Sequence, residues 1–374
     1  MENFSRSSLS KANTIVIKVG SSSLLDKEGC LSQKEFDKIA SEISNLKKLN
    51  KNAILVSSGA IAAGKEYLPK LSIEATIQEK QAAAAIGQGR LMQFYERSFA
   101  KFGLLPAQVL LTRDVISNRT RYINARNTIN QIINFNAIPI INENDVISDE
   151  EIKFGDNDTL SAIVANLLGA DLLIILSDVE GFMTNGKVVN EIEKINPDIE
   201  RYAKGAGSSK GTGGMITKLS AAKISISAGI PVVIAGFFKE DVIKRILQGE
   251  KIGTLFIPKE SKILGKKRWL LGNKKIAGKI VVDDGAKKAL AEKGKSLLPI
   301  GVKDIKGHFE RGDIVGLFDQ FGKEFARGII NYNSKELAII KGKSTKEAKT
   351  LIKALPSDEI VHRNNMVILW GRTI

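Results

Sequence analysis

Two clusters of acidic and amide side chains lie close together in the chain and are well suited to bind a polar ligand. They are Asn142-Glu143-Asn144-Asp145 and Gly155-Asp156-Asn157-Asp158. A strand-like apolar run, 137–141, precedes the first cluster, and a helix-like run, 159–168, follows the second. Open α/β sheets bind ligands where strands pass into helices. Asp and Asn also favour turns and helix N-caps, so loop chemistry is the alternative to a ligand site.

Three glycine-rich segments have the composition of an anion-binding turn. They are Gly20-Ser21-Ser22-Ser23, Ser57-Ser58-Gly59-Ala60 and the segment from Gly211 to Lys218. Small residues let backbone amides approach an anion, and a following helix N-terminus adds a favourable dipole. The first two segments are weak signals, because tight strand-to-helix turns need glycine in any case. The third is more specific, since it adds two threonine hydroxyls and a lysine.

Lys18 and Lys218 could bracket a phosphoryl group during its transfer. The transition state of that reaction spreads negative charge over oxygen atoms, so fixed cations and amides supply most of the catalysis. The full P-loop pattern is absent, because Leu337 stands where the first glycine would precede Gly342-Lys343-Ser344. The His-Arg-Asp loop of protein kinases is absent too. Any ATP chemistry must therefore use another scaffold.

Histidine usage limits the chemistry further. The only histidines are His308 and His362, so the first part of the chain has no histidine base, no Ser-His-Asp triad and no histidine metal site. An acceptor that is already ionised fits this absence. A carboxylate such as a glutamate side chain, with a pKa of about 4.3, needs no proton removed before it attacks phosphorus.

The elements that would position these residues alternate along the chain. Strand-like runs occupy 14–19, 53–57, 108–112, 138–142, 172–177 and 231–235, and helix-period runs occupy 33–49, 74–102, 122–135, 158–168 and 215–228. This alternation predicts an open, mostly parallel sheet with helices on both faces, a three-layer α/β/α fold. Beyond a basic stretch near 259–275, short glycine-rich β runs and one short helix at 285–293 predict a small, mainly β barrel.

Composition fits a two-domain globular protein. The chain has 374 residues, of which 43% are hydrophobic and 26% charged, enough for two or three cores. It contains no apolar run of about 20 residues and no apolar signal core, so we expect no membrane association and a cytoplasmic location. Cys30 is the single cysteine, which excludes an internal disulfide, and we interpret it as an ordinary loop residue.

The net charge is concentrated near the C-terminus. From Ser261 onward there are 24 Lys and Arg against 12 Asp and Glu, a charge of +12 out of +15 for the whole chain. Such asymmetry is typical of proteins with an anionic partner such as nucleic acid. A solvated, solubilising surface would have the same composition.

Taken together, these motifs resemble the amino acid kinase superfamily and, within it, the glutamate 5-kinase family. The likeness rests on eight segments in order over about 250 residues: Lys18-Val19-Gly20-Ser21-Ser22, Ser57-Ser58-Gly59-Ala60-Ile61-Ala62-Ala63-Gly64, Leu111-Thr112-Arg113, Asn124-Ala125-Arg126-Asn127-Thr128, Ile141-Asn142-Glu143-Asn144-Asp145, Gly155-Asp156-Asn157-Asp158, Ser177-Asp178-Val179-Glu180-Gly181 and Gly211 to Lys218. The segment at about 275–355 resembles a PUA domain, a module that binds RNA in other proteins. The expected limits are a kinase domain over 1–260, a linker over 261–275 and a PUA-like domain over 276–374.

The resemblance implies ATP-dependent phosphorylation of the γ-carboxylate of L-glutamate, at the start of proline synthesis. It implies catalytic roles for Lys18, Lys218 and Asp158, with Asp158 orienting the two lysines. It implies ATP binding by Lys18, Ser177, Asp178, Thr212, Gly213, Gly214, Met215, Ile216, Thr217 and Lys218. It implies glutamate binding by Ser58, Asp145 and Asn157, with Asp145 taking the ammonium group. Mg²⁺ would be bound mainly by the ATP phosphates, so no protein metal ligand is expected.

The family also suggests regulation and assembly. Proline is expected as feedback inhibitor at a site that overlaps 118–126, Glu143 and Asp145, and a homo-oligomer, dimer or tetramer, is expected. The chain departs from the family pattern with Ser21 and Ser57 where Thr is frequent, and with a shorter turn over 182–187. The alternatives are a related kinase acting on acetylglutamate, aspartate or carbamate, and an RNA-binding accessory role of the PUA-like domain.

Overall fold

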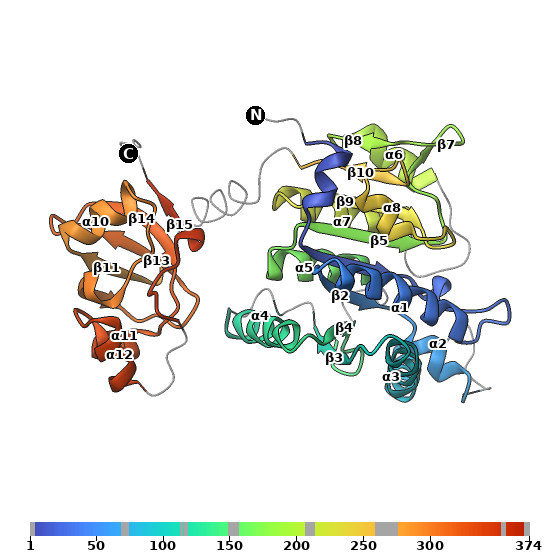
Figure 1. The fold of residues 1–374 in the computed structure, drawn as a ribbon, viewed down its shortest axis with the longest axis horizontal. Helices are drawn as coiled ribbons and strands as arrows, with labels where there is room; N and C mark the ends of the chain where they lie inside the picture. The colour runs from blue at the N-terminus through green and yellow to red at the C-terminus, as the bar shows by residue number, and fades with distance from the viewer. Residues whose placement is uncertain are drawn as a thin grey trace. The chain divides into compact units, whose positions relative to one another are not determined.

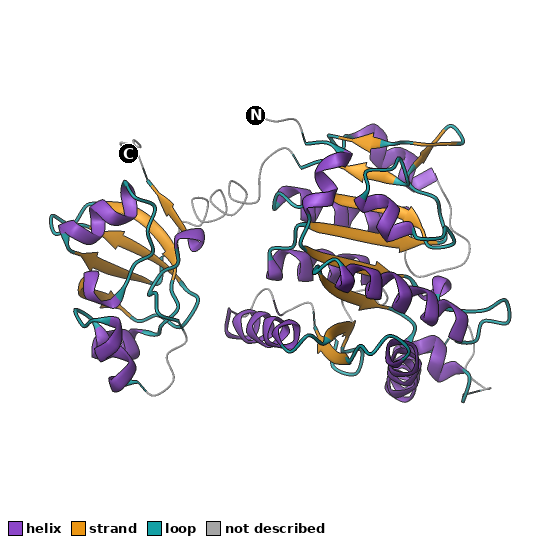
Figure 2. Cartoon of the chain, in the orientation of Figure 1, coloured by secondary structure: helices purple, strands orange, loops and turns teal. Residues whose placement is uncertain are grey.

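The structure is a computed structural model that describes residues 4–68, 75–112, 115, 119–148, 157–205, 214–258, 276–352 and 357–369. The chain forms two compact units, one of Met1–Ile116 and Ala125–Ser261 and one of Ser117–Asn124 and Lys262–Ile374, and each is described by itself (Figures 1 and 2). The expected linker lies outside the described residues, and the domain limits given above remain predictions.

An eight-stranded sheet forms the centre of the first unit, in the order β3-β4-β2-β1-β5-β9-β10-β8 (Figure 1). All neighbouring pairs are parallel except β9 with β10. The strands are β1 Thr14–Val19, β2 Asn52–Ser57, β3 Pro106–Leu111, β4 Ile138–Glu143, β5 Leu172–Ser177, β8 Glu191–Ile192, β9 Val232–Gly236 and β10 Thr254–Phe256. Strands β1, β2, β4, β5 and β9 are buried almost throughout, which explains their continuous apolar sequences.

Helices cover both faces of this sheet. They are α1 Gln33–Lys48, α2 Ala60–Lys65, α3 Ile77–Ala100, α4 Arg119–Asn134, α5 Asn157–Leu168, α6 Pro197–Gly205, α7 Met215–Ser227 and α8 Val242–Leu247. Ile15, Ile17 and Val19 of β1 pack in one core with α1, α3 and α8. Lys18 alternates with them and therefore points to the opposite face, where it meets α5. The predicted three-layer α/β/α fold is confirmed.

Several short elements were not predicted from the sequence patterns. Helices α2, α6 and α8 and strand β10 each have too few residues for a clear period. The short turn after Gly181 contains a two-strand hairpin, β6 Met183–Thr184 and β7 Lys187–Val188. Asn185 and Gly186 have φ angles of 49° and 75° at its tip, as a tight hairpin turn requires.

A five-stranded sheet forms the second unit, in the order β12-β11-β13-β14-β15. Its elements are β11 Gly278–Val282, β12 Val302–Gly307, β13 Ile314–Phe318, β14 Glu324–Ile329, β15 Met366–Ile368, α10 Asp284–Ala291, α11 Ser334–Ile340 and α12 Thr345–Leu351. The expectation of a single helix was wrong, since α11 and α12 follow α10. Both begin with capping boxes, Asn333 with Glu336 and Ser344 with Glu347, a local signal that the sequence does contain.

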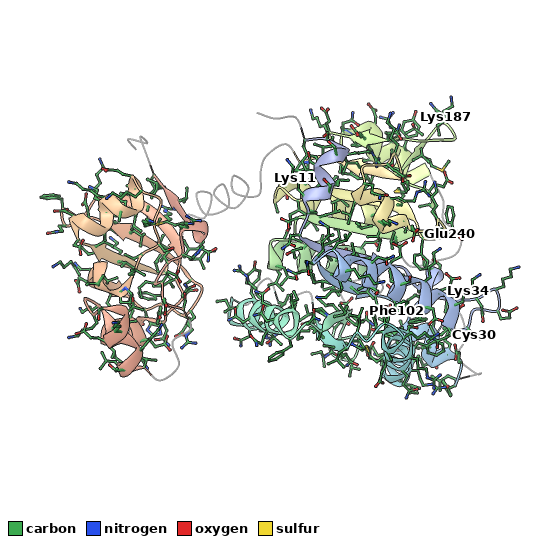
Figure 3. The ribbon with its side chains drawn as sticks, in the orientation of Figure 1. Lys11, Cys30, Lys34, Phe102, Lys187 and Glu240 are labelled. Carbon is green, nitrogen blue, oxygen red and sulfur yellow. The ribbon has the colours of Figure 1, made fainter. Side chains whose placement is uncertain are left out.

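No helix in the described part of the chain is long and apolar enough to cross a membrane. Cys30 is a free, exposed residue near a turn (Figure 3), as expected.

Candidate active site

Three charged side chains meet beneath the carboxyl end of β1. The Lys18 Nζ lies 2.6 Å from one oxygen of Asp158, and the Lys218 Nζ lies 3.3 Å from the other. The exposed fractions are 6% for Lys18, 0% for Asp158 and 5% for Lys218. Strand β1 and the first turns of α5 and α7 supply one residue each, so this site exists only once the sheet and both helices have packed.

The electrostatics of this triad favour its charged form. Burial alone would raise the pKa of Asp158, but the charges of Lys18 and Lys218 outweigh burial and hold that pKa below its ordinary value. Thr217 Oγ1 also lies 2.8 Å from Asp158 Oδ2 and 2.8 Å from the Gly214 carbonyl oxygen, and its single hydrogen is shared between these two acceptors. The carboxylate thus holds two ammonium groups, and the three side chains together carry one net positive charge. A negatively charged group bound beside them would complete the balance.

The strand order places this triad at a switch point of the sheet. From β1 the chain passes to β2 on one side, and later strands β5 and β9 continue on the other side. Val19 at the end of β1 pairs with Ser57 of β2 and with Leu176 of β5. Ligands of open α/β sheets bind outside the carboxyl ends of the strands at such a point. The charged triad therefore lies where a ligand is expected to bind, between the β2 and β4 side and the β5 side of the sheet.

Hydrogen-bonding residues gather on the β2 and β4 side. Asn157 Nδ2 lies 2.9 Å from the Ser57 carbonyl oxygen, 2.9 Å from Ser58 Oγ and 3.0 Å from Asn142 Oδ1. Its two hydrogens are shared among these three acceptors. The structure thus brings Ser58 and Asn157 together, as the sequence likeness implies. Asn157 and Asp158 are consecutive in α5, so this amide cluster is directly joined to the charged triad.

Asp145 follows β4 and is partly buried. Burial, with a smaller contribution from the nearby Glu143 carboxylate, raises the pKa of Asp145 to about 6. A cation bound beside Asp145 would relieve this repulsion and lower the pKa again. The two carboxylates therefore suit an ammonium group better than an uncharged one.

On the β5 side, Ser177 ends the strand and Asp178 follows it. Ser177 is buried and its Oγ donates to Asp178 Oδ1 over 2.9 Å, while Asp178 is exposed. Gly214 is the N-cap of α7, and Met215, Ile216, Thr217 and Lys218 form its first turn. Thr212, Gly213, Gly155, Asp156 and Asn118 lie outside the described residues, as does most of the glycine-rich segment before α7.

Gly20 lies immediately beside the triad. A Cβ on Gly20 would lie 3.7 Å from Lys18 Nζ, and the backbone there has an ordinary φ of −72°. Glycine is therefore not required by backbone strain at this position. A Cβ there would be in van der Waals contact with the lysine ammonium, so glycine keeps that position free of a side chain, as close approach of an anion would need.

Three contributors to the site were not predicted from the sequence. Asn142 binds Asn157 as described, and Gln88 Oε1 of α3 accepts from Asn142 Nδ2 over 2.9 Å. Tyr95 of α3 forms a buried hydroxyl pair with Ser57, 2.6 Å between oxygens. Asn142 belongs to the first polar cluster, which was a usable signal. Gln88 and Tyr95 lie in an ordinary amphipathic helix and carry no local signal.

The described residues contain no group of three His, Cys, Asp or Glu side chains suited to hold a metal ion. Both oxygens of Asp158 face lysines. A divalent cation at the triad would thus have to be held mainly by oxygens of a bound ligand.

Comparisons with known proteins identify the families to which the two parts of the chain are similar. Residues 13–236 match the amino acid kinase family and residues 278–352 match the PUA domain. The glutamate 5-kinase of Dictyoglomus thermophilum is 48% identical over 363 residues, which cover 95% of this chain and 97% of that protein. The glutamate 5-kinase of Pelobacter propionicus is 44% identical over 366 residues, which cover 96% and 98%. Among solved structures, the carbamate kinase from Giardia lamblia bound to AMP-PNP is 19% identical with a TM-score of 0.48, covering 67% of this chain and 100% of that one.

Proposed function

The chain belongs to the amino acid kinase family and, within it, to the glutamate 5-kinases, and from this premise we infer that it phosphorylates L-glutamate with ATP. The products are L-glutamyl 5-phosphate and ADP, in the first step of proline biosynthesis. The observation that best supports this function is the buried ion cluster of Lys18, Asp158 and Lys218 at the switch point of the sheet.

The reaction needs charge neutralisation and alignment but no general base. An oxygen of the ionised glutamate side chain attacks the γ-phosphorus, and the bond from that phosphorus to the β,γ-bridging oxygen breaks, so that ADP carries the electron pair away. Lys18 and Lys218 stabilise the charge on the transferring group. Asp158 holds the two ammonium groups in place without accepting a proton. This role division explains how a domain without histidine can catalyse the step.

The strand order suggests how the two substrates approach each other. Ser58, Asp145 and Asn157 would bind glutamate on the β2 and β4 side, with the Asp145 carboxylate facing the substrate ammonium. Ser177 and Asp178 would line the nucleotide site on the β5 side. The N-terminal turn of α7, from Gly214 to Lys218, would hold the phosphates together with Thr212 and Gly213. Mg²⁺ fits this site as an ion bound by the ATP phosphates, whose negative charge it would further neutralise.

A hydroxylamine trap tests the function directly. The native protein is incubated with ATP, Mg²⁺ and one acid at a time, and hydroxylamine converts any acyl phosphate to a coloured hydroxamate. We expect product with L-glutamate. Product with acetylglutamate or aspartate, and none with glutamate, would assign the chain to the rival activity within the same family.

Regulation by proline is part of this proposal. Proline shares the ammonium and α-carboxylate of glutamate, so Asp145 and Glu143 could bind it where glutamate binds. We expect proline to raise the KM for glutamate in the same assay. Inhibition that glutamate cannot overcome would place proline elsewhere.

The charge of +12 from Ser261 onward supports a second, accessory function, RNA binding by the PUA domain. Binding through phosphates weakens steeply with salt. Gel shifts of the full chain with single-stranded RNA across a salt series test this.

A homo-oligomer is likewise proposed from the family, and light scattering of the purified chain measures its mass.

A further inference from the structure

Helix α3 contributes a side chain to the amide cluster without belonging to any motif. Gln88 Oε1 accepts a hydrogen bond from Asn142 Nδ2 over 2.9 Å, and Asn142 Oδ1 accepts from Asn157 Nδ2 over 3.0 Å. We propose that Gln88 is a positioning residue for the glutamate site, which acts through Asn142 on Asn157. This inference rests on the proposed function and assigns a further residue to it.

Gln88 matters to the site because of the direction of the hydrogen bonds that Asn142 makes. Asn142 Oδ1 accepts from two donors, the Glu143 amide over 2.9 Å and Asn157 Nδ2 over 3.0 Å. The amino group of Asn142 must then face the other way, toward Gln88. An acceptor at position 88 therefore stabilises the one orientation of Asn142 that can receive Asn157. A side chain without an acceptor would leave the buried Asn142 amino group unpaired, which weakens the hold on that orientation.

The same reasoning extends to Asn157. Its amino group faces three acceptor oxygens, on Ser57, Ser58 and Asn142, within 3.0 Å, and shares its two hydrogens among them. These contacts fix which end of Asn157 is amino and which is carbonyl, and they connect it to Ser58. Rotation of Asn142 would place two amino groups against each other and disturb Asn157 and Ser58 together. Both of these residues are proposed to bind glutamate.

Helix α3 is well placed to hold Gln88 still. Gly87, its neighbour, packs so closely on α2 that a Cβ would lie 1.9 Å from the Ala60 carbonyl oxygen. Two turns further along, Tyr95 is fully buried and its hydroxyl lies 2.6 Å from Ser57 Oγ. The helix is thus fixed on both sides of Gln88, against the segment that carries Ser57 and Ser58. A fixed support of this kind keeps binding groups in their productive geometry.

Kinetic constants of three variants test the proposal. Gln88→Met keeps the length of the side chain but cannot accept, and Gln88→Glu keeps the acceptor oxygen. Gln93→Met is the matched control, because Gln93 lies on the same helix, is exposed and interacts with Arg90. The readouts are kcat, the KM for glutamate, the KM for ATP and the temperature of thermal unfolding, all on the full chain.

We expect Gln88→Met to raise the KM for glutamate by about 3- to 10-fold, the effect of one neutral hydrogen bond. The KM for ATP should stay within about twofold, since the triad and the β5 side are untouched. Gln88→Glu should return the KM for glutamate toward the native value, and Gln93→Met should change nothing. In an Asn142→Ala background, Gln88→Met should have no further effect on glutamate binding, measured by calorimetry.

Three results would overturn the proposal. They are an unchanged KM for glutamate in Gln88→Met, an equal rise of both KM values with a lower unfolding temperature, and independent, multiplying effects of Gln88→Met and Asn142→Ala. A native enzyme that forms no hydroxamate from glutamate overturns the proposed function and this inference with it. An active native enzyme with unaltered Gln88→Met kinetics overturns the inference alone.

Discussion

At the scale of single residues, the site depends on charges that are buried together. Lys18 and Lys218 are held by one carboxylate, Asp158, whose pKa their charges keep low. Removing one member of a buried ion cluster leaves the others uncompensated, whereas an exposed pair contributes little. Asp145 differs, because its carboxylate has a raised pKa and a neighbouring carboxylate in place of a lysine.

Asp158→Asn should separate catalysis from folding. The amide keeps the shape of the side chain but cannot hold two ammonium groups, and we expect kcat to fall by about 100-fold or more, the effect of misplacing catalytic groups. Hydroxamate formation under saturating substrates measures this. Asp37→Asn is the control, since Asp37 forms a partly exposed pair with Lys101 at 2.6 Å. Equal losses in both variants would argue against a special role for Asp158.

Glutamate binding should depend on pH through Asp145. Its pKa is raised to about 6 in the structure without substrate, so it is ionised above that pH and neutral below it. As the pH falls through 6, the carboxylate loses its attraction for the substrate ammonium, and the KM for glutamate should rise about tenfold for each further pH unit. The side chain of free glutamate stays ionised down to about pH 5.

Asp145→Asn provides the check on that interpretation. The variant should have a raised KM for glutamate at pH 8 and a flat KM between pH 5.5 and 8. A variant that retains the native pH profile would assign the titration to another group.

At the scale of elements, the site depends on how closely α2 and α3 pack. A Cβ on Gly64 of α2 would lie 1.9 Å from the Ala83 carbonyl oxygen of α3. The same helices carry the segment after Ser58 and the residues Gln88 and Tyr95. Gly64 and Gly87 are therefore required by packing.

Gly64→Ala should destabilise the protein. The added methyl group must displace backbone, and we expect the free energy of unfolding to fall by about 1–3 kcal/mol, as for other overpacked sites. Gly89→Ala is the matched control, because Gly89 lies in α3 with nothing within 4 Å of its Cβ position. That change should stabilise by up to about 1 kcal/mol through helix propensity. Denaturant unfolding of both variants measures the difference, and a neutral Gly64→Ala would contradict the packing argument.

At the scale of the whole molecule, each of the two compact units contains a large hydrophobic core of its own among the described residues. One is built from residues between Leu9 and Leu255, and the other from residues between Ile280 and Met366. All residues proposed for catalysis and substrate binding lie in the first unit. A domain with its own core and its own site can act alone.

A chain ending at residue 258 should therefore keep its kinase activity. We expect kcat within about threefold of the full chain, because no proposed site residue is removed. The same truncation should abolish RNA binding if the full chain shows any, since it removes the basic segment. Hydroxamate formation and gel shifts on one preparation measure both effects. Loss of kinase activity with retained folding, judged by circular dichroism, would show that the second unit supports the site.

The sequence by itself determined the layered α/β fold, the run of strands and the chemistry of the site. Buried parallel strands and amphipathic helices have clear periods, and the charged and amide residues lie in compact motifs, so Lys18, Asn157, Asp158 and Lys218 could be proposed without coordinates, with the help of the family resemblance. What the tertiary structure decided was which motifs meet. The strand order brings β1 between β2 and β5, and only packing brings α3 to Asn142. Gln88 and Asn142 are separated by 54 positions, and no local period or propensity reports a contact at that distance. Residues that support a site from another element are therefore seen only in the folded chain.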